Sequence, residues 1–184
     1  GYFQSALGDI LRNGGLAGSA ITLYDIDARK RAPLEAMGKR LAAQAGTGMT
    51  VRACKELADA VDGADFAVSA IGGAGASLGG VYASDVQRQD RLIPAKYGIY
   101  QTFGDTAGPG GMMMAFRSIP IYLGICREMA RRCPRVVFVN HSNPMAVLCR
   151  AMLKYSGLKT VIGLCHGVQH GIVIAADLLA VPPE

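Results

Sequence analysis

Short apolar runs, each closed by glycine, aspartate or asparagine, alternate along this chain with segments of helical periodicity. Alternating strands and helices imply right-handed crossovers, and hence a parallel, doubly wound sheet of the α/β class. We expect strands at 20–24, 49–53, 66–71, 135–139 and 160–164. We expect helices at 3–13, 29–45, 112–132, 145–155 and 171–179, and a helical turn at 56–61. Ile119 and Pro120 predict a kink or break in the long helix, and residues 83–111 are interpreted as a polar loop.

The first expected element is a helix preceded by a single glycine. A doubly wound nucleotide-binding fold normally starts with a strand whose glycine-rich turn leads into that helix. We therefore expect residues 1–184 to be one dinucleotide-binding domain that lacks its first strand, with Gly1 as the last glycine of the turn. A small complete domain with ragged ends is the alternative.

Composition excludes several classes of protein. Hydrophobic residues make up 51% of the chain and charged residues 18%, which excludes a disordered chain. The net charge of +5 is spread out except at Arg29-Lys30-Arg31 and Arg131-Arg132, so we expect no nucleic-acid partner. The longest uncharged run, 66–84, contains five glycines and is a poor membrane span. An odd count of five cysteines without CxxC spacing favours reduced thiols and a cytoplasmic location.

Acidic and glycine residues follow two of the expected strands. A carboxylate at Asp25, with Asp27 nearby, can accept the ribose hydroxyls of NAD and repels the 2′-phosphate of NADP. Asp25 is the better candidate, because Asp27 can equally be the N-cap of the next helix. Gly72-Gly73 after the third strand would let a dinucleotide lie against the backbone.

The last two strands also end in residues that can carry chemistry. Asn143 can fix a substrate hydroxyl by donating and accepting, although an ordinary Asn-Pro turn is the alternative. Cys165 and His166 can hold a divalent ion, and because neighbours on an extended chain point to opposite sides, only one of them should ligate. The alternative is a buried structural cysteine beside a capping histidine.

Five segments taken in order resemble glycoside hydrolase family 4, a family of NAD- and manganese-dependent glycosidases. They are LYDID (23–27), RLIPAKYGIYQTFGDTAGPGGMMMAFRSIP (91–120), NHSNP (140–144), GLCHGVQ (163–169) and LLAVPPE (178–184). The resemblance covers nearly the whole chain. It implies a lactate/malate dehydrogenase-type Rossmann fold and the cofactors NAD and Mn²⁺ or another divalent metal.

The resemblance also implies a redox route to glycoside hydrolysis, unlike that of the two-carboxylate glycosidases. The sugar is oxidised at C3 by NAD⁺, loses its C2 proton, eliminates the C1 group, adds water and is reduced again. It implies Cys165 as a metal ligand, His166 as a catalytic residue, Asn143 as a substrate ligand and Asp25 as the ribose-binding acid. Further assignments are Arg88 and Gln101 to the substrate, and Phe3 and Asn140 to the cofactor.

Two details refine the expected substrate. A histidine after the metal cysteine is typical of the branches that act on non-phosphorylated α-glycosides and uronides, and Gln87 stands where phospho-specific members carry arginine. The resemblance places the second metal ligand, a histidine, beyond Glu184, and the catalytic tyrosine further on, in a C-terminal domain that is not in this chain. We also expect a homo-oligomer, a dimer or tetramer. The alternatives are an NAD-dependent 2-hydroxy-acid dehydrogenase of the lactate/malate type and a non-catalytic NAD-binding module.

Overall fold

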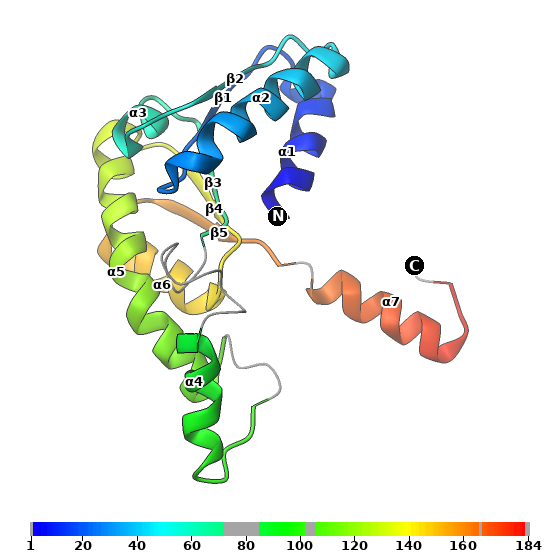
Figure 1. Ribbon diagram of the computed structural model, residues 1–184, viewed down its shortest axis with the longest axis vertical. Helices are drawn as coiled ribbons and strands as arrows, with labels where there is room; N and C mark the ends of the chain where they lie inside the picture. The colour runs from blue at the N-terminus through cyan, green and yellow to red at the C-terminus, as the bar shows by residue number, and fades with distance from the viewer. Residues whose placement is uncertain (1, 72–84, 102–105, 166, 183–184) are drawn as a thin grey trace.

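A computed structural model of the chain describes residues 2–71, 85–101, 106–165 and 167–182 (Figure 1). The strands are β1 (Ala20–Leu23), β2 (Thr50–Ala53), β3 (Phe66–Ser69), β4 (Val137–Asn140) and β5 (Thr160–Gly163). The helices are α1 (Tyr2–Arg12), α2 (Ala28–Ala45), α3 (Leu57–Val61), α4 (Asp85–Ala95), α5 (Gly108–Arg132), α6 (Met145–Tyr155) and α7 (Gly167–Leu179), with a 3₁₀ turn, η1, at Gly14–Leu16. Among the described helices, none is long and apolar enough to cross a membrane.

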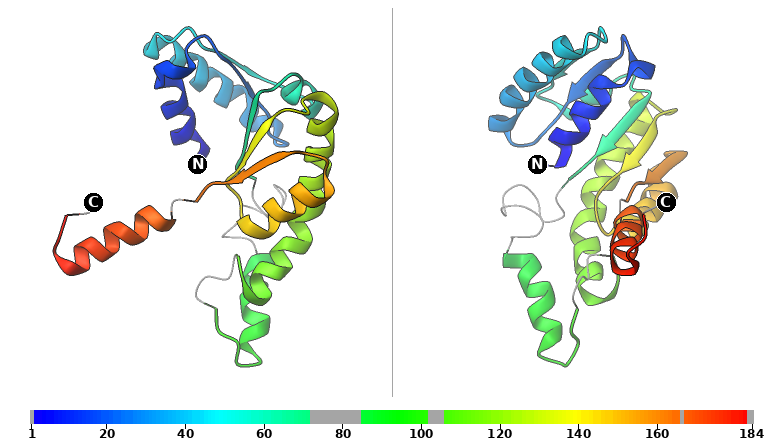
Figure 2. Two further views of the ribbon diagram at one scale, coloured as in Figure 1. Left: turned by 180° about the vertical axis from the view of Figure 1, so that it is seen from behind. Right: turned by 90° about the vertical axis from the view of Figure 1, so that its right-hand side faces the viewer.

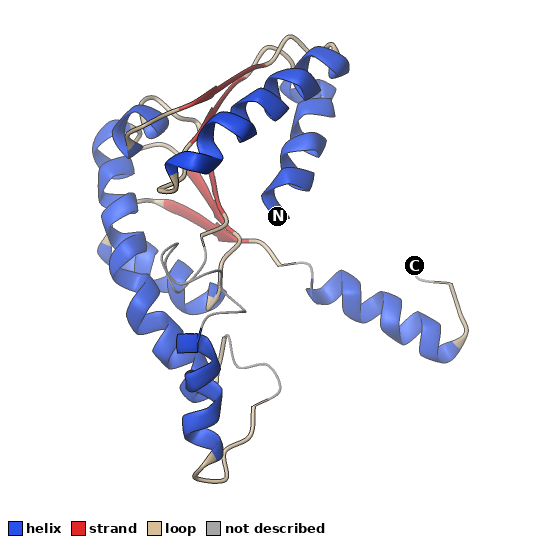
Figure 3. Cartoon of the chain, viewed as in Figure 1, coloured by secondary structure: helices blue, strands red, loops and turns tan. Residues whose placement is uncertain are grey.

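All strand pairs among the described residues are parallel, in two hydrogen-bonded sheets (Figure 3). One sheet has the order β1-β2 and the other β3-β4-β5. A doubly wound fold has the order 3-2-1-4-5-6. In this order, β2 and β1 correspond to positions 3 and 2, and β3, β4 and β5 correspond to positions 4, 5 and 6. No described residue occupies position 1, which lies between β1 and β3. The α/β doubly wound prediction is confirmed, although two sheets replace the single one expected.

Each sheet has its own core. Leu7 and Leu11 of α1 are fully buried against residues of β1, α2 and β2. The larger core lies where α5 and α6 pack on one face of β4, around Tyr122, Phe138 and Leu148. Its side chains come from helix faces and from alternate strand positions, as the periodicities of 3.6 and 2 require.

The other face of the β3-β4-β5 sheet is largely uncovered. The strand register places Phe66, Val137 and Thr160 in one row, and Val68, Val139 and Ile162 in the next row on the same face. Phe66 is 68% exposed, Val68 45% and Ile162 48%. Helix α7 likewise extends away from the sheets in Figure 1 and in the left view of Figure 2, and its residues Ile172, Val173, Ile174, Leu178 and Leu179 are exposed.

Most of the predicted elements are confirmed within a few residues, and two predictions are wrong. The segment 83–111 is not a continuous loop, because α4 occupies Asp85–Ala95. The long helix α5 begins at Gly108 and continues as one helix through Pro120, so the break considered at this position is absent, while the kink stays a prediction.

The face of helix α4 that packs on α5 has a salt bridge at its centre instead of a continuous apolar stripe. Among the described side chains of α4, the less exposed ones are Val86, Asp90, Pro94 and Ala95, and the first three follow one helix face at intervals of four residues. Asp90, only 7% exposed, accepts hydrogen bonds from both Nη atoms of Arg117 on α5. A charged residue at the centre of the packed face hides the helix from an analysis that looks for hydrophobic periodicity.

This salt bridge should contribute measurably to stability. Replacing Arg117 with glutamine removes the charge that pairs with the buried Asp90 carboxylate. The free energy of unfolding should fall by about 2 kcal/mol. This loss is smaller than for a fully buried ion pair, because the side chain of Arg117 is partly exposed. Urea denaturation measures the loss. The matched control is Arg12→Gln, which breaks the exposed Arg12–Asp9 pair and should cost less than about 1 kcal/mol. Equal losses of stability in the two variants would contradict the proposed contribution of the Asp90–Arg117 salt bridge.

Candidate functional site

The predicted ligands Asn143 and Cys165 follow the carboxyl ends of two neighbouring strands. Asn140 of β4 pairs with Gly163 of β5 in the parallel register, and the amide of Leu164 donates to the carbonyl of Asn140. Asn143 lies three residues beyond one strand end and Cys165 two residues beyond the other. Because ligands of open α/β sheets bind outside the carboxyl ends of the strands, this edge is the candidate site.

A buried hydrogen-bond network holds this edge together. The Oδ1 atom of Asn140, whose side chain is fully buried, accepts from the hydroxyl of Ser69 at 3.1 Å and from the amide of Ser142 at 3.1 Å. Its Nδ2 atom donates to the carbonyl of Ser142 at 3.0 Å. The Ser69 hydroxyl also lies 3.2 Å from that of Tyr122, whose pKa is raised by burial. Asn140 thus joins β3, β4, α5 and the segment leading to Asn143.

Asn143 and Cys165 differ in their surroundings. Asn143 is half-buried, and its Oδ1 accepts from the amide of Met145 at 3.3 Å, where α6 begins. Cys165 is exposed, and its Sγ accepts from the amide of Gly167 at 3.3 Å at the start of α7. The alternative of a buried structural cysteine at this position is therefore wrong.

Asp25 and Asp27 lie just beyond β1 and have different partners. One carboxylate oxygen of Asp25 accepts from the amide of Asp27 at 2.8 Å. Asp27 is the N-cap of α2: its Oδ1 accepts from the amide of Arg29 at 3.1 Å, and both its oxygens bind the Arg29 guanidinium at 3.0 Å. These hydrogen bonds lower the pKa of Asp27 to about 2. The N-cap interpretation of Asp27 is confirmed.

Of the predicted substrate ligands, Gln101 has a structural role and Arg88 is exposed. The side chain of Gln101 donates to the carbonyl of Ala107 at 3.1 Å and accepts from the amide of Gly110 at 3.0 Å, which caps the start of α5. Arg88 lies exposed on α4. The substrate assignments of both residues stay predictions.

Several predicted residues lie outside the described part of the chain. Gly1, Gly72, Gly73 and His166 are among them, and the side chain of Phe3, within α1, is also not described. The start of α1 is the part of the chain that the sequence analysis assigns to the cofactor through Gly1 and Phe3. The first turn of α1 lies near the carboxyl end of β3 (Figures 1 and 2). The amino end of a helix carries partial positive charge and suits a pyrophosphate.

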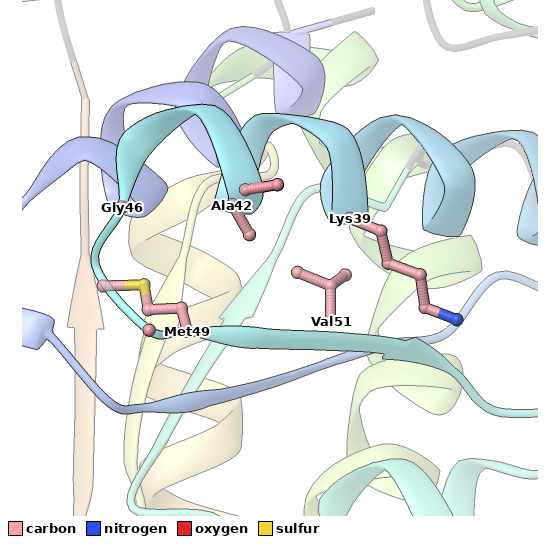
Figure 4. Close-up of a pocket in the computed structure, with 7 residues that line it drawn as sticks. Lys39, Ala42, Gly46, Met49 and Val51 are labelled. Carbon is pink, nitrogen blue, oxygen red and sulfur yellow. The ribbon is translucent and has the colours of Figure 1, made fainter.

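A surface hollow lies away from the candidate site. A hollow of about 330 Å³ is lined by Lys39, Ala42 and Gly46 from α2 and its end and by Gly48, Met49 and Val51 leading into β2 (Figure 4). It adjoins the amino end of β2, opposite the edge at which α/β sheets bind ligands. The hollow is therefore separate from the candidate site.

Comparison with known proteins identifies the family. The sequence profile of "Family 4 glycosyl hydrolase" matches residues 1–180. The chain belongs to glycosyl hydrolase family 4. The chain is 36% identical to the α-galactosidase of Bacillus subtilis over 168 residues, which is 91% of this chain and 37% of the relative. It is 31% identical to the α-galacturonidase of Thermoanaerobacterium saccharolyticum over 170 residues, 91% of this chain and 35% of the relative. The chain spans about a third of the length of these family 4 relatives.

Solved structures agree with this assignment. The proposed glucosidase lplD of Bacillus subtilis is 30% identical, with a TM-score of 0.76 over 98% of this chain and 40% of the other. A 6-phospho-α-glucosidase from gut microorganisms, in complex with NAD and Mn²⁺, is 22% identical with a TM-score of 0.76, over 98% of this chain and 40% of the other. The malate dehydrogenase of Plasmodium falciparum, in complex with NADH, has a TM-score of 0.61 at 15% identity, over 98% of this chain and 46% of the other. The last two likenesses establish the fold alone, which is the dehydrogenase-type Rossmann fold expected for family 4.

The residues present fit the two cofactors of the family to different degrees. A carboxylate has about four acceptor positions, so Asp25 can bind ribose hydroxyls while it accepts from Asp27. For the metal, Cys165 supplies one exposed sulfur, and the described residues contain no group of three or more histidine, cysteine or acidic side chains that could hold an ion. The described part of this family 4 chain thus offers one candidate ribose ligand, Asp25, and one candidate metal ligand, Cys165.

The Asn140 network can be tested through stability. Replacing Asn140 with leucine, which is similar in size, leaves the amide and carbonyl of Ser142 without their buried partner, and should lower the free energy of unfolding by about 2–3 kcal/mol. The matched variant Ser69→Ala removes one neutral hydrogen bond at this site and should cost about 1 kcal/mol. Chemical denaturation compares the two. An Asn140→Leu protein as stable as the wild type would show that the network contributes nothing.

Proposed function

We propose that the intact protein is a family 4 glycosidase that hydrolyses O-glycosyl bonds with NAD and a divalent metal, Mn²⁺ in the first instance. Residues 1–184 form its NAD-binding domain, and the catalytic domain lies outside this chain. The observation that carries the proposal is the placement of Asn143 and Cys165 at the ends of two directly paired strands, β4 and β5. A hydroxyl-binding amide and a metal-binding thiolate at one edge suit a sugar bound through its hydroxyls to a cation.

The residues of this chain have separate roles in the proposal. Asp25 binds the adenosine ribose, and Asn143 orients a sugar hydroxyl. Cys165 holds the metal, and His166, next to it in sequence, moves a proton at the substrate. When bound, NAD and the metal supply reversible oxidation of the sugar and stabilisation of the negative charge that develops on its oxygens.

The substrate is a non-phosphorylated α-glycoside or uronide. Cys165 is followed by histidine, and Gln87 replaces the arginine of phospho-specific members. The relatives named as α-galactosidase and α-galacturonidase support the same choice. A cytoplasmic location and a homo-oligomeric state also stay predictions.

Activity assays decide among the candidate functions. The intact protein, with NAD⁺ and Mn²⁺, should release p-nitrophenol from an α-galactoside, α-glucoside or α-galacturonide faster than from the corresponding 6-phosphates. A preference for the 6-phosphates would overturn the substrate assignment. Oxidation of lactate or malate without glycoside cleavage would favour a dehydrogenase. NAD⁺ binding without either reaction would favour a binding module.

The ribose ligand has its own test. Asp25→Asn keeps an oxygen for the amide of Asp27 but removes the charge, so NAD⁺ affinity should fall by about 1.5–3 kcal/mol. Isothermal titration calorimetry measures it. Asp62→Asn, at an exposed carboxylate paired with Arg132, is the control and should leave affinity unchanged. Unchanged affinity in Asp25→Asn would remove this residue from the site.

The metal ligand is tested by Cys165→Ser. The substitution should abolish Mn²⁺-dependent hydrolysis and leave NAD⁺ affinity nearly unchanged, because the cofactor and the metal contact different atoms. Substrate deuterated at C2 or C3 should react more slowly in the wild type, with solvent deuterium appearing at C2. The control is Cys133→Ser, at the cysteine that ends α5, which has no proposed metal role and lies away from the carboxyl ends of the strands. Normal turnover of Cys165→Ser without added metal would eliminate the metal role.

A further inference from the structure

Three consecutive basic residues begin α2, directly after the proposed ribose-binding site. Arg29, Lys30 and Arg31 form the longest run of consecutive basic residues in the sequence, and the proposed reaction gives them no role. All three have partners in the structure. Arg29 makes a two-point ion pair with Asp27, and Lys30 Nζ lies 4.0 Å from Asp27 Oδ2. Arg31 donates to the carbonyl of Lys55, beyond β2, at 2.8 Å.

This location matters for the choice of cofactor. NAD and NADP differ by a phosphate on the 2′-oxygen of the adenosine ribose, which dinucleotide-binding folds place at the end of the second strand of the fold. Here that position corresponds to the end of β1. Arginine is the side chain best suited to such a phosphate, because its fork of N–H groups matches two phosphate oxygens. Arg29 and Lys30 are thus the groups on α2 that could make this domain accept NADP.

We propose that Asp27 selects against NADP by occupying Arg29 and Lys30, a role distinct from the binding of ribose by Asp25. The proposal rests on the proposed function, because it presumes that the adenosine ribose of NAD lies against Asp25. It assigns Asp27 to specificity and Asp25 to affinity.

The geometry supports this division of roles. Asp27 is 16% exposed and is fixed by capping α2, whereas the side chain of Arg29 is 90% exposed and has its ion pair with Asp27 as its link to the fold. The carboxylate thus orients the guanidinium and cancels its charge. Asp25 makes no ion pair among the described residues, and its carboxylate receives the backbone amide of Asp27.

The test is Asp27→Asn in the intact protein. Asparagine is as good an N-cap as aspartate, so α2 should stay capped while Arg29 and Lys30 lose their counter-charge. Calorimetry gives the dissociation constants for NAD⁺ and NADP⁺, and 5′-AMP with adenosine 2′,5′-bisphosphate serves as a second pair that probes the adenosine end alone. The ratio of the NADP⁺ constant to the NAD⁺ constant should fall at least fivefold. The gain in NADP⁺ affinity should become smaller as salt is added, because salt screens the electrostatic attraction between the basic side chains and the 2′-phosphate.

Further variants separate the proposed role from a structural one. Adding Arg29→Gln to Asp27→Asn should return the ratio towards the wild-type value, and Asp62→Asn, which breaks the distant pair with Arg132, should leave it unchanged. A ratio unchanged by Asp27→Asn, or a gain that survives the loss of Arg29, would overturn the proposal. Failure of the wild type to bind either NAD⁺ or 5′-AMP would instead refute the proposed cofactor site, so the two failures are distinguishable.

Discussion

The candidate site depends on one buried side chain, the amide of Asn140. A fully buried amide must satisfy both its donors and its acceptor, and Asn140 does so with the hydroxyl of Ser69, the backbone of Ser142 and the sulfur of Cys149. These bonds fix the end of β3 against the end of β4 and set the path of the chain into Asn143. Through the pairing of β4 with β5, the same edge carries the segment that leads to Cys165. A residue assigned from sequence to the cofactor therefore also has a clear structural role.

The two acidic residues after β1 show that neighbouring carboxylates can have different partners. Asp27 is committed to the helix that follows, through the amide and guanidinium of Arg29. Asp25 is bonded to backbone through one oxygen. Sequence reasoning named both residues and anticipated the capping alternative for Asp27. The ion pair with Arg29 was not anticipated, because the spacing of two residues in sequence does not reveal the rotamers that bring the charges together.

The alternating apolar runs were enough to predict the strands, most of the helices and the parallel arrangement, because burial between strands and helices leaves a strong periodic signal. The same approach failed for α4, where a salt bridge between Asp90 and Arg117 takes the place of an apolar stripe. At the candidate site, sequence located the strand ends that carry Asp25, Asn143 and Cys165. It could not locate the Ser69–Tyr122 contact, because this contact joins residues that only the tertiary fold brings together.

The uncovered face of the β3-β4-β5 sheet has a practical consequence. Phe66, Val68 and Ile162 form a contiguous apolar surface there, and α7 carries a second set of exposed aliphatic side chains. Apolar patches of this kind draw chains together when nothing covers them. We therefore expect these 184 residues, studied alone, to self-associate through the two apolar surfaces. The apparent molecular mass measured by light scattering should then rise with protein concentration.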